Sequence, residues 1–356
     1  MRALHIYAGP LARQHLQRQG LQPADVGVIP AAAGGPKGLL LGRLDRFLFG
    51  EWLAHSTHRV DLVGASIGAW RMATACMPDT VARFAQLEHD YIHQSYDVEP
   101  GQRRPSARHV SERFSGSLAY FYGGQVPTLL AHPRYRLHIV ASRGRHVLRR
   151  DTAWRTPLGY TGAFLTNVVS RRAMGLWLER VVFSAQGSDL PFASADYRTR
   201  QLPLRADNFL PALQASCSIP FALQAVPAIA GAPPGAYWDG GITDYHLHLA
   251  YRPERGLVLY PHFQRQVVPG WLDKSLRWRH GATPFLDSTL VLAPNPAWVA
   301  TLPNGKLPDR SDFVRYGTDT AARARVWLQA VSASQQLADE WAEWLHHPDL
   351  SVVQPL

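Results

Sequence analysis

A serine between two glycines, at the end of an apolar run, is the first residue whose surroundings indicate chemistry. The stretch 64–68 (GASIG) follows the apolar segment 59–63, and residues 69–77 after it have helical spacing. Flanking glycines leave room for a sharp turn that exposes the serine hydroxyl, and a helix start behind it favours developing negative charge. This context predicts that Ser66 is a nucleophile for acyl transfer.

A second glycine-containing turn, residues 34–38 (GGPKG), also joins a predicted strand (25–33) to a segment with helical spacing (39–52). Its spacing fits neither a nucleoside-triphosphate loop nor a dinucleotide-binding loop. Free backbone N–H groups at such a junction are suited to an oxyanion, although Pro36 has none to donate. The residues of the predicted oxyanion hole are Gly34, Gly35, Lys37 and Gly38.

An aspartate follows the short aromatic strand at 237–238 and precedes two glycines, in the stretch 238–241 (WDGG). A carboxylate presented from a tight loop is suited to accept the proton of a serine hydroxyl. Because Asp-Gly is also a common turn, the motif gains meaning only beside the other two. We predict that Asp239 is the general base.

The three motifs in this order resemble the patatin-like phospholipase family. The resemblance extends over residues 25–245 and includes 215–220 (ASCSIP), which is similar to the serine-containing, proline-ended segment before the family's aspartate motif. Lys37 stands where the family has a basic residue. Ala33 departs from the pattern, because the family's loop usually opens with three glycines, and its methyl group narrows the backbone freedom of the loop.

The resemblance implies a Ser–Asp dyad without a catalytic histidine. Ser66 would attack the ester of a lipid or other acyl-ester substrate, and Asp239 would serve as base and then activate water. No cofactor and no metal are implied. The expected fold is a mostly parallel α/β sheet flanked by helices, in three layers, and the expected location is cytoplasmic with peripheral membrane contact.

Two enzymatic alternatives stay open at this point. An ordinary α/β-hydrolase would place a catalytic histidine after the aspartate. Histidines in that part of the chain are His246, His248, His262, His280, His346 and His347. Acyl transfer to an alcohol or thiol would use the same acyl-enzyme, so the sequence does not separate it from hydrolysis.

A third alternative, of another class, is a non-catalytic protein that binds anionic lipid. Arginine clusters that would suit an anionic membrane surface are Arg103–Arg104, Arg108, 143–150 and Arg171–Arg172. No nucleic-acid-binding motif accompanies them, so we expect no nucleic-acid partner. The pairs His89/His93 and His246/His248 have spacing for zinc but lack a third ligand by spacing, and we expect no metal site.

One α/β domain over residues 1–356 is predicted, with the motifs in 25–245 and an extension over 246–356. Apolar segments predict strands at 25–33, 59–63, 135–142, 178–185, 237–238, 256–260 and 288–293, and spacing predicts helices at 10–19, 80–95 and 207–216. Residues 97–130 predict a loop-rich cap, because proline, glycine, serine and arginine are frequent at its start. Residues 318–345 predict one long C-terminal helix.

Composition fits this picture. Lys+Arg 37 against Asp+Glu 27 gives a net charge of +10, and only three of the basic residues are lysines. Cys76 and Cys217 are too few for a disulfide scaffold and fit a reducing compartment. Neither a signal peptide nor a membrane-spanning run is expected from the apolar pattern, which favours an intracellular protein.

Overall fold

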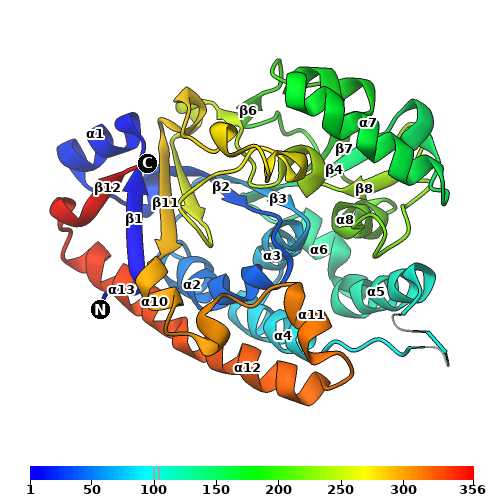
Figure 1. Cartoon of the computed structure of the whole chain (residues 1–356). Helices are drawn as coiled ribbons and strands as arrows, with labels where there is room; N and C mark the ends of the chain where they lie inside the picture. The colour runs from blue at the N-terminus through cyan, green and yellow to red at the C-terminus, as the bar shows by residue number, and fades with distance from the viewer. Residues whose placement is uncertain (99–100, 103–104) are drawn as a thin grey trace.

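A mostly parallel sheet forms the centre of the molecule (Figure 1). The computed structural model describes residues 1–98, 101–102 and 105–356. Among them, a ten-stranded sheet contains β1 (Leu4–Ala8), β2 (Val26–Ala31), β3 (Val60–Ala65), β4 (Tyr135–Gly144), β5 (Leu178–Ser184), β7 (Thr199–Pro203), β8 (Tyr237–Asp239), β10 (Leu257–Pro261), β11 (Thr289–Pro294) and β12 (Val353–Pro355). Strands β6 (Phe192–Ala193) and β9 (Ala250–Tyr251) form a separate antiparallel pair.

The strands lie in the order β12-β1-β11-β10-β2-β3-β4-β5-β7, and β8 pairs with β4. Neighbours are antiparallel at β1–β11, β4–β5 and β4–β8 and parallel at the other pairings of this sheet. Strands β2 and β3 are buried along their whole length, as expected of central parallel strands covered on both faces. The predicted α/β fold class is confirmed.

Helices flank the sheet on both faces. They are α1 (Pro10–Gln19), α2 (Gly42–Phe47), α3 (Ile67–Ala75), α4 (Thr80–His93), α5 (Ala107–Tyr122), α6 (Val126–Leu130), α7 (Arg155–Val169), α8 (Phe209–Cys217), α9 (Gly241–Asp244), α10 (Pro296–Val299), α11 (Ser311–Tyr316), α12 (Thr320–Ala333) and α13 (Gln335–His346). Helices α2, α3, α8 and α13 share one apolar cluster with the sheet. On the other face, valines of β3, β4 and β10 pack against the segment 245–251.

The prediction of a loop-rich cap over residues 97–130 is wrong for its larger part, which forms α5 and α6. Ser106 caps α5, since its hydroxyl accepts a hydrogen bond from the His109 N–H at 3.2 Å. Phe114 and Leu118 then recur at helical spacing on the buried face. The prediction rested on the frequent proline, glycine, serine and arginine residues and did not take the helical spacing of these apolar residues into account. The Arg103–Arg104 cluster lies outside the described residues.

The prediction of one long C-terminal helix is also wrong, because α12 and α13 are separate helices that meet at Ser334. The Ser334 hydroxyl donates to the Val331 carbonyl at 2.7 Å, and its backbone N–H is shared between the carbonyls of Ala330 and Val331. A side chain that bonds the preceding turn competes with the regular helical ladder and bends it. Figure 1 shows the two helices in succession along one side of the molecule.

Strands from both ends of the chain join the central sheet. β1 lies between β11 and β12, and Ile6 pairs with Leu292 on one side and Val353 on the other. The predicted extension after residue 246 therefore supplies β10, β11 and β12 to the sheet that also contains β2 and β3. Among the described helices, none combines the length and apolar character needed to cross a bilayer.

Candidate active site

The sheet topology brings the motif serine and the motif aspartate together. Ser66 follows β3 and Asp239 ends β8, and both of these strands pair with β4. Because Ala65 pairs with Val140 and Asp239 pairs with Ala141, the two residues emerge at the same level of the sheet. The Ser66 Oγ donates a 2.6 Å hydrogen bond to Asp239 Oδ2, and both residues are buried.

Ser66 has a strained backbone conformation of the kind that a nucleophile elbow requires. Its φ is 57° and its ψ is −130°, which is rare for a residue with a side chain. A Cβ on Gly68 would lie 1.9 Å from the Ala31 carbonyl oxygen, and one on Gly64 would lie 2.4 Å from the Ala69 Cα. The turn is therefore too tight for any other residue at either glycine position.

Ser216, on α8, ties the elbow to the sheet. Its hydroxyl accepts the Ser66 N–H at 3.0 Å and donates to the Val140 carbonyl at 2.6 Å. Its carbonyl accepts the Gly240 N–H at 3.1 Å. Ser216 thus positions both halves of the Ser66–Asp239 pair. The sequence marks the stretch 215–220 as similar to a family segment, but its spacing does not distinguish the role of Ser216 from that of its neighbours.

Asp239 is held rigidly by its two following glycines. The Gly241 N–H donates to Asp239 Oδ1 at 2.7 Å, and a Cβ on Gly240 would lie 2.1 Å from the Val140 carbonyl oxygen. Burial raises the pKa of Asp239 above its usual value, and the Arg310 charge and the Ser66 hydrogen bond offset only part of that rise. A raised pKa makes this carboxylate a stronger base than an exposed aspartate.

The glycine turn at 34–38 lies between the elbow and the aspartate loop. It opens a 3₁₀ helix over Gly35–Leu41, and Gly35 has a positive φ of 57°. A Cβ on Gly38 would touch the Ile67 side chain at 3.0 Å, and one on Gly241 would touch Ala33 Cβ at 2.5 Å. The turn therefore contacts both motifs, and helix starts of this kind leave backbone N–H groups free.

Three cations, which we call the cation rim, lie near the Ser66–Asp239 pair: Lys274 and Arg310, whose charges act on Asp239, and Lys37 of the glycine turn. The Lys37 Nζ lies 5.1 Å from the Phe263 ring centroid, and the Lys274 Nζ lies 4.4 Å from that of Tyr245. Arg310 borders the glycine turn, since a Cβ on Gly35 would lie 3.2 Å from its Nε. Within the described residues none of the three forms an ion pair, whereas Lys306 pairs with Asp309 and Asp312.

The cation rim is close enough to be coupled electrostatically. Partial desolvation of the Lys274 ammonium, together with the positive charges of Lys37 and Arg310, lowers the pKa of Lys274 to about 8, although part of the side chain stays exposed. Burial likewise lowers the pKa of Lys37. Lys274 and Arg310 are exposed, and the positive charge of each lowers the pKa of Asp239. Excess positive charge here would attract an anionic group.

The histidines that follow Asp239 have other partners. His246 Nδ1 accepts the Val268 N–H at 3.0 Å, His248 Nε2 lies 2.8 Å from Thr283 Oγ1, and His280 Nε2 lies 2.9 Å from the Asp273 carbonyl. In the described part of the chain, no histidine hydrogen-bonds to Ser66 or Asp239. Nor do the described residues place three or more His, Cys, Asp or Glu side chains around a possible metal ion.

A buried Ser–His–Asp contact does exist elsewhere. His138 lies 3.0 Å from Asp61 Oδ1 and 2.9 Å from Ser184 Oγ. Asp61 precedes Ser66 on β3 by five residues, roughly 16 Å along the strand. Unlike Ser66, Ser184 has no positive φ and no flanking glycines, so it lacks the sharp turn that presents a nucleophile. We interpret this group as a structural hydrogen-bond network.

Comparison with known proteins adds little to this geometry. No family model matches the sequence, and no curated protein matches it either. Among solved structures, VipD from Legionella pneumophila aligns with a TM-score of 0.38 and 13% sequence identity, over 95% of this chain and 70% of that one. A likeness this distant supports no conclusion about this chain.

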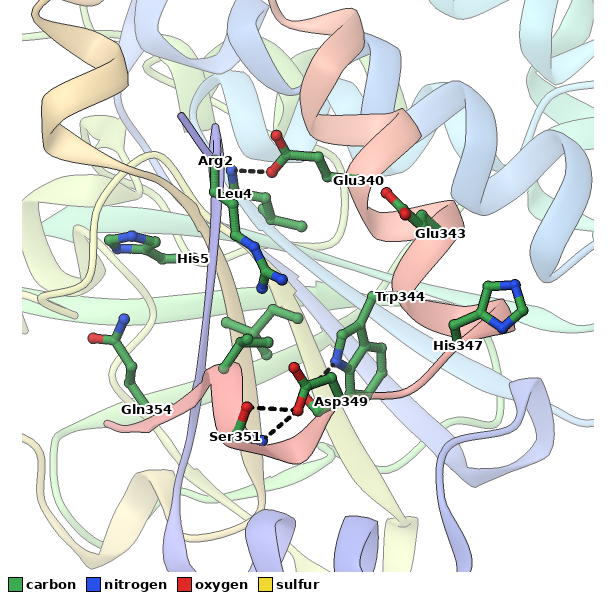
Figure 2. Close-up of a pocket in the computed structure, with 12 residues that line it drawn as sticks. Arg2, Leu4, His5, Glu340, Glu343, Trp344, His347, Asp349, Ser351 and Gln354 are labelled. Carbon is green, nitrogen blue, oxygen red and sulfur yellow. Dashed lines mark hydrogen bonds between the residues drawn. The ribbon is translucent and has the colours of Figure 1, made fainter.

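A cavity of about 450 Å³ lies away from the dyad, between α13 and the strands β1 and β12 (Figure 2). Its lining is mostly polar. The Glu340 carboxylate accepts the Ala3 and Leu4 N–H groups, and Asp349 accepts from the N–H and hydroxyl of Ser351. Glu340 joins the N-terminal strand to α13 and Asp349 caps its own turn, so both carboxylates have structural partners and we assign the cavity no chemical role.

Proposed function

We propose that this chain is a serine-dependent acyl hydrolase that cleaves lipid esters through a Ser66–Asp239 dyad, as the resemblance to patatin-like phospholipases implies. The observation that carries the proposal is the 2.6 Å hydrogen bond from Ser66 Oγ to a buried carboxylate. The positive φ of Ser66 and the raised pKa of Asp239 support it, because they suit a nucleophile and a base respectively.

In the proposed reaction, Ser66 Oγ attacks the ester carbonyl while its proton passes to Asp239. The C–O bond to the alcohol then breaks, and Asp239 returns the proton to the leaving alkoxide. Water next attacks the acyl-enzyme with Asp239 as base, which releases the carboxylic acid and restores Ser66. N–H groups from Gly34, Gly35, Lys37 and Gly38 are the candidates to stabilise the oxyanion. The Ser66 N–H is engaged by Ser216.

Hydrolysis of an acyl ester should depend on pH through Asp239. The base must be ionised, so kcat/KM is expected to rise with pH, with its half-point above the ~3.9 of an ordinary aspartate. Arg310→Gln should move the half-point upward, because loss of the positive charge makes Asp239 harder to ionise. Initial rates across pH for both proteins measure this, and Ser66→Ala gives the background. A half-point unchanged by Arg310→Gln would contradict this use of Asp239.

Esters that carry a negative charge near the scissile bond should be preferred. On the pH plateau, the ratio of kcat/KM for an acylglycerol phosphate to that for the acylglycerol of equal chain length is expected to exceed one. In Lys274→Gln/Arg310→Gln this ratio should fall at least about ten-fold, because two charge-assisted contacts are lost. A separate measurement distinguishes hydrolysis from acyl transfer: with an added alcohol present, hydrolysis yields the free carboxylic acid, whereas acyl transfer yields the ester of the added alcohol. An unchanged ratio would leave the cation rim without a role in substrate choice.

A further inference from the structure

Helix α7 exposes a stripe of large apolar side chains on its outer face, with the polar Thr161 between them. The exposed fractions are 61% for Trp154, at its start, 55% for Leu158, 61% for Leu165 and 85% for Val169. Spacings of four, seven and four residues place these side chains on one side of the helix. The opposite side is buried, with Thr156, Tyr160, Ala163 and Asn167 packed inward. Helix α7 is therefore apolar toward solvent as well as toward the core.

Segments near α7 expose three further large apolar side chains. Leu176, Phe221 and Trp278 are all exposed. Phe221 borders the inner side of α7, since its ring centroid lies 6.1 Å from that of the buried Tyr160. Trp278 is joined to the end of α7 through the adjacent Arg279, whose guanidinium donates to the Val168 carbonyl at 3.2 Å. We call these exposed side chains on and around α7 the α7 face.

Arginines bracket the α7 face at both ends. Arg149 and Arg150 precede the helix and Arg172 follows it, and all three are exposed. The Arg155 guanidinium lies 5.0 Å from the Trp154 ring centroid. Within the described residues none of these arginines forms an ion pair, and the nearby Asp151 carboxylate accepts instead from Thr156 and from the Ala225 N–H. The apolar stripe therefore lies within uncompensated positive charge.

We propose that the α7 face docks the protein on the surface of a lipid bilayer that contains anionic lipids. A helix that combines an exposed apolar face containing Trp and Leu with flanking arginines lies in the membrane interface, where the apolar side chains enter the acyl boundary and the cations contact head groups. The exposed arginines at both ends of the α7 face favour an anionic membrane over a second copy of the chain. A symmetric contact with a second copy would bring both sets of arginines together and would be repulsive.

The inner side of α7 packs against the strand that ends at Asp239. The Tyr160 ring centroid lies 6.1 Å from that of Trp238, which is the neighbour of Asp239. Docking does not depend on the dyad being catalytic, because the proposal concerns attachment to a surface and can be measured without turnover.

Flotation of the full chain with phosphatidylcholine vesicles, with and without phosphatidylglycerol, tests this proposal. The protein is expected to float with the phosphatidylglycerol vesicles. Leu158→Glu/Leu165→Glu should reduce the vesicle-bound to free ratio at least about ten-fold, because charged side chains cannot enter the acyl boundary. Arg150→Gln/Arg172→Gln should reduce it about 30-fold, which corresponds to ~1 kcal/mol for each arginine.

Leu11→Glu is the matched control, since Leu11 is an exposed leucine on α1, far from α7 in Figure 1, and this variant should bind as the wild type does. Circular dichroism and the melting temperature verify that every variant is folded. The proposal is overturned if the wild type does not float, if the α7 variants float as well as the wild type, or if neutral vesicles bind equally. It is also overturned if sedimentation shows a dimer or a protein complex that Leu158→Glu/Leu165→Glu dissociates.

Discussion

Asp239→Asn is expected to lower kcat/KM for ester hydrolysis about 1000-fold or more while the protein stays folded. Asparagine has nearly the same shape, so its Oδ1 can still accept the Gly241 N–H that Asp239 binds at 2.7 Å. It cannot take the proton of Ser66, and the hydroxyl then remains a weak nucleophile. Steady-state kinetics with a soluble acyl ester measure the loss.

The stability of the same variant separates a catalytic from a structural role. The pKa of the Asp239 carboxyl is higher in the folded than in the unfolded chain. Its ionisation therefore costs folding free energy, and this cost is present in full once the pH exceeds both pKa values. Asp239→Asn should therefore be at least as stable as the wild type at neutral pH in urea unfolding. Asp207→Asn, at an exposed aspartate, is the control and should keep full activity. A folded Asp239→Asn protein with near wild-type kcat/KM would show that Asp239 is not the base.

Arg180→Met is expected to lower the free energy of unfolding by at least about 3 kcal/mol, because it leaves a buried charge without its main partner. Arg180 Nε and one terminal nitrogen bind the two oxygens of Asp244 at 2.7 and 2.6 Å, and both side chains are fully buried. Burial would raise the pKa of Asp244, but Arg180 outweighs it and holds this pKa below its usual value. Arg171 contacts Asp244 at 3.1 Å and compensates only in part.

Since Asp244 ends α9, directly after the aspartate loop, Arg180→Met should also reduce ester hydrolysis. The double variant Arg180→Met/Asp244→Leu removes both charges and should recover most of the lost stability. The free energies of unfolding in urea of the wild type, the two single variants and the double variant form a double-mutant cycle, which gives the coupling energy of the pair. Additive losses, with no recovery in the double variant, would mean that the pair does not act as a unit.

The core of the site could be predicted because its residues carry local signals. The turn around Ser66 requires glycine at positions 64 and 68, because a Cβ there would lie 2.4 Å or less from backbone atoms. Two glycines on either side of a serine are easily recognised in a sequence. Strands β2, β3, β4, β5, β10 and β11 were likewise predicted from continuous apolar runs and are confirmed. Short elements without such runs, β1, β7 and β12 among them, were not predicted.

Other parts of the site have no local signal. Ser216, Lys274 and Arg310 come from three distant segments, and only the folded chain brings them beside Ser66 and Asp239. The α7 face was missed for a related reason. Trp154, Leu158 and Leu165 have the spacing of an ordinary core-facing stripe, and only the structure shows that this stripe is exposed while the opposite side packs inward.

Labelling with a fluorophosphonate tests the central claim most directly, since this probe phosphonylates an activated serine and releases fluoride. Intact-protein mass spectrometry should show one adduct on the wild type, peptide mapping should place it on Ser66, and Ser66→Ala should remain unlabelled under the same conditions. Asp239→Asn should label far more slowly. A folded wild-type protein without an adduct, or an adduct that persists in Ser66→Ala, would contradict the assignment of Ser66 as the nucleophile.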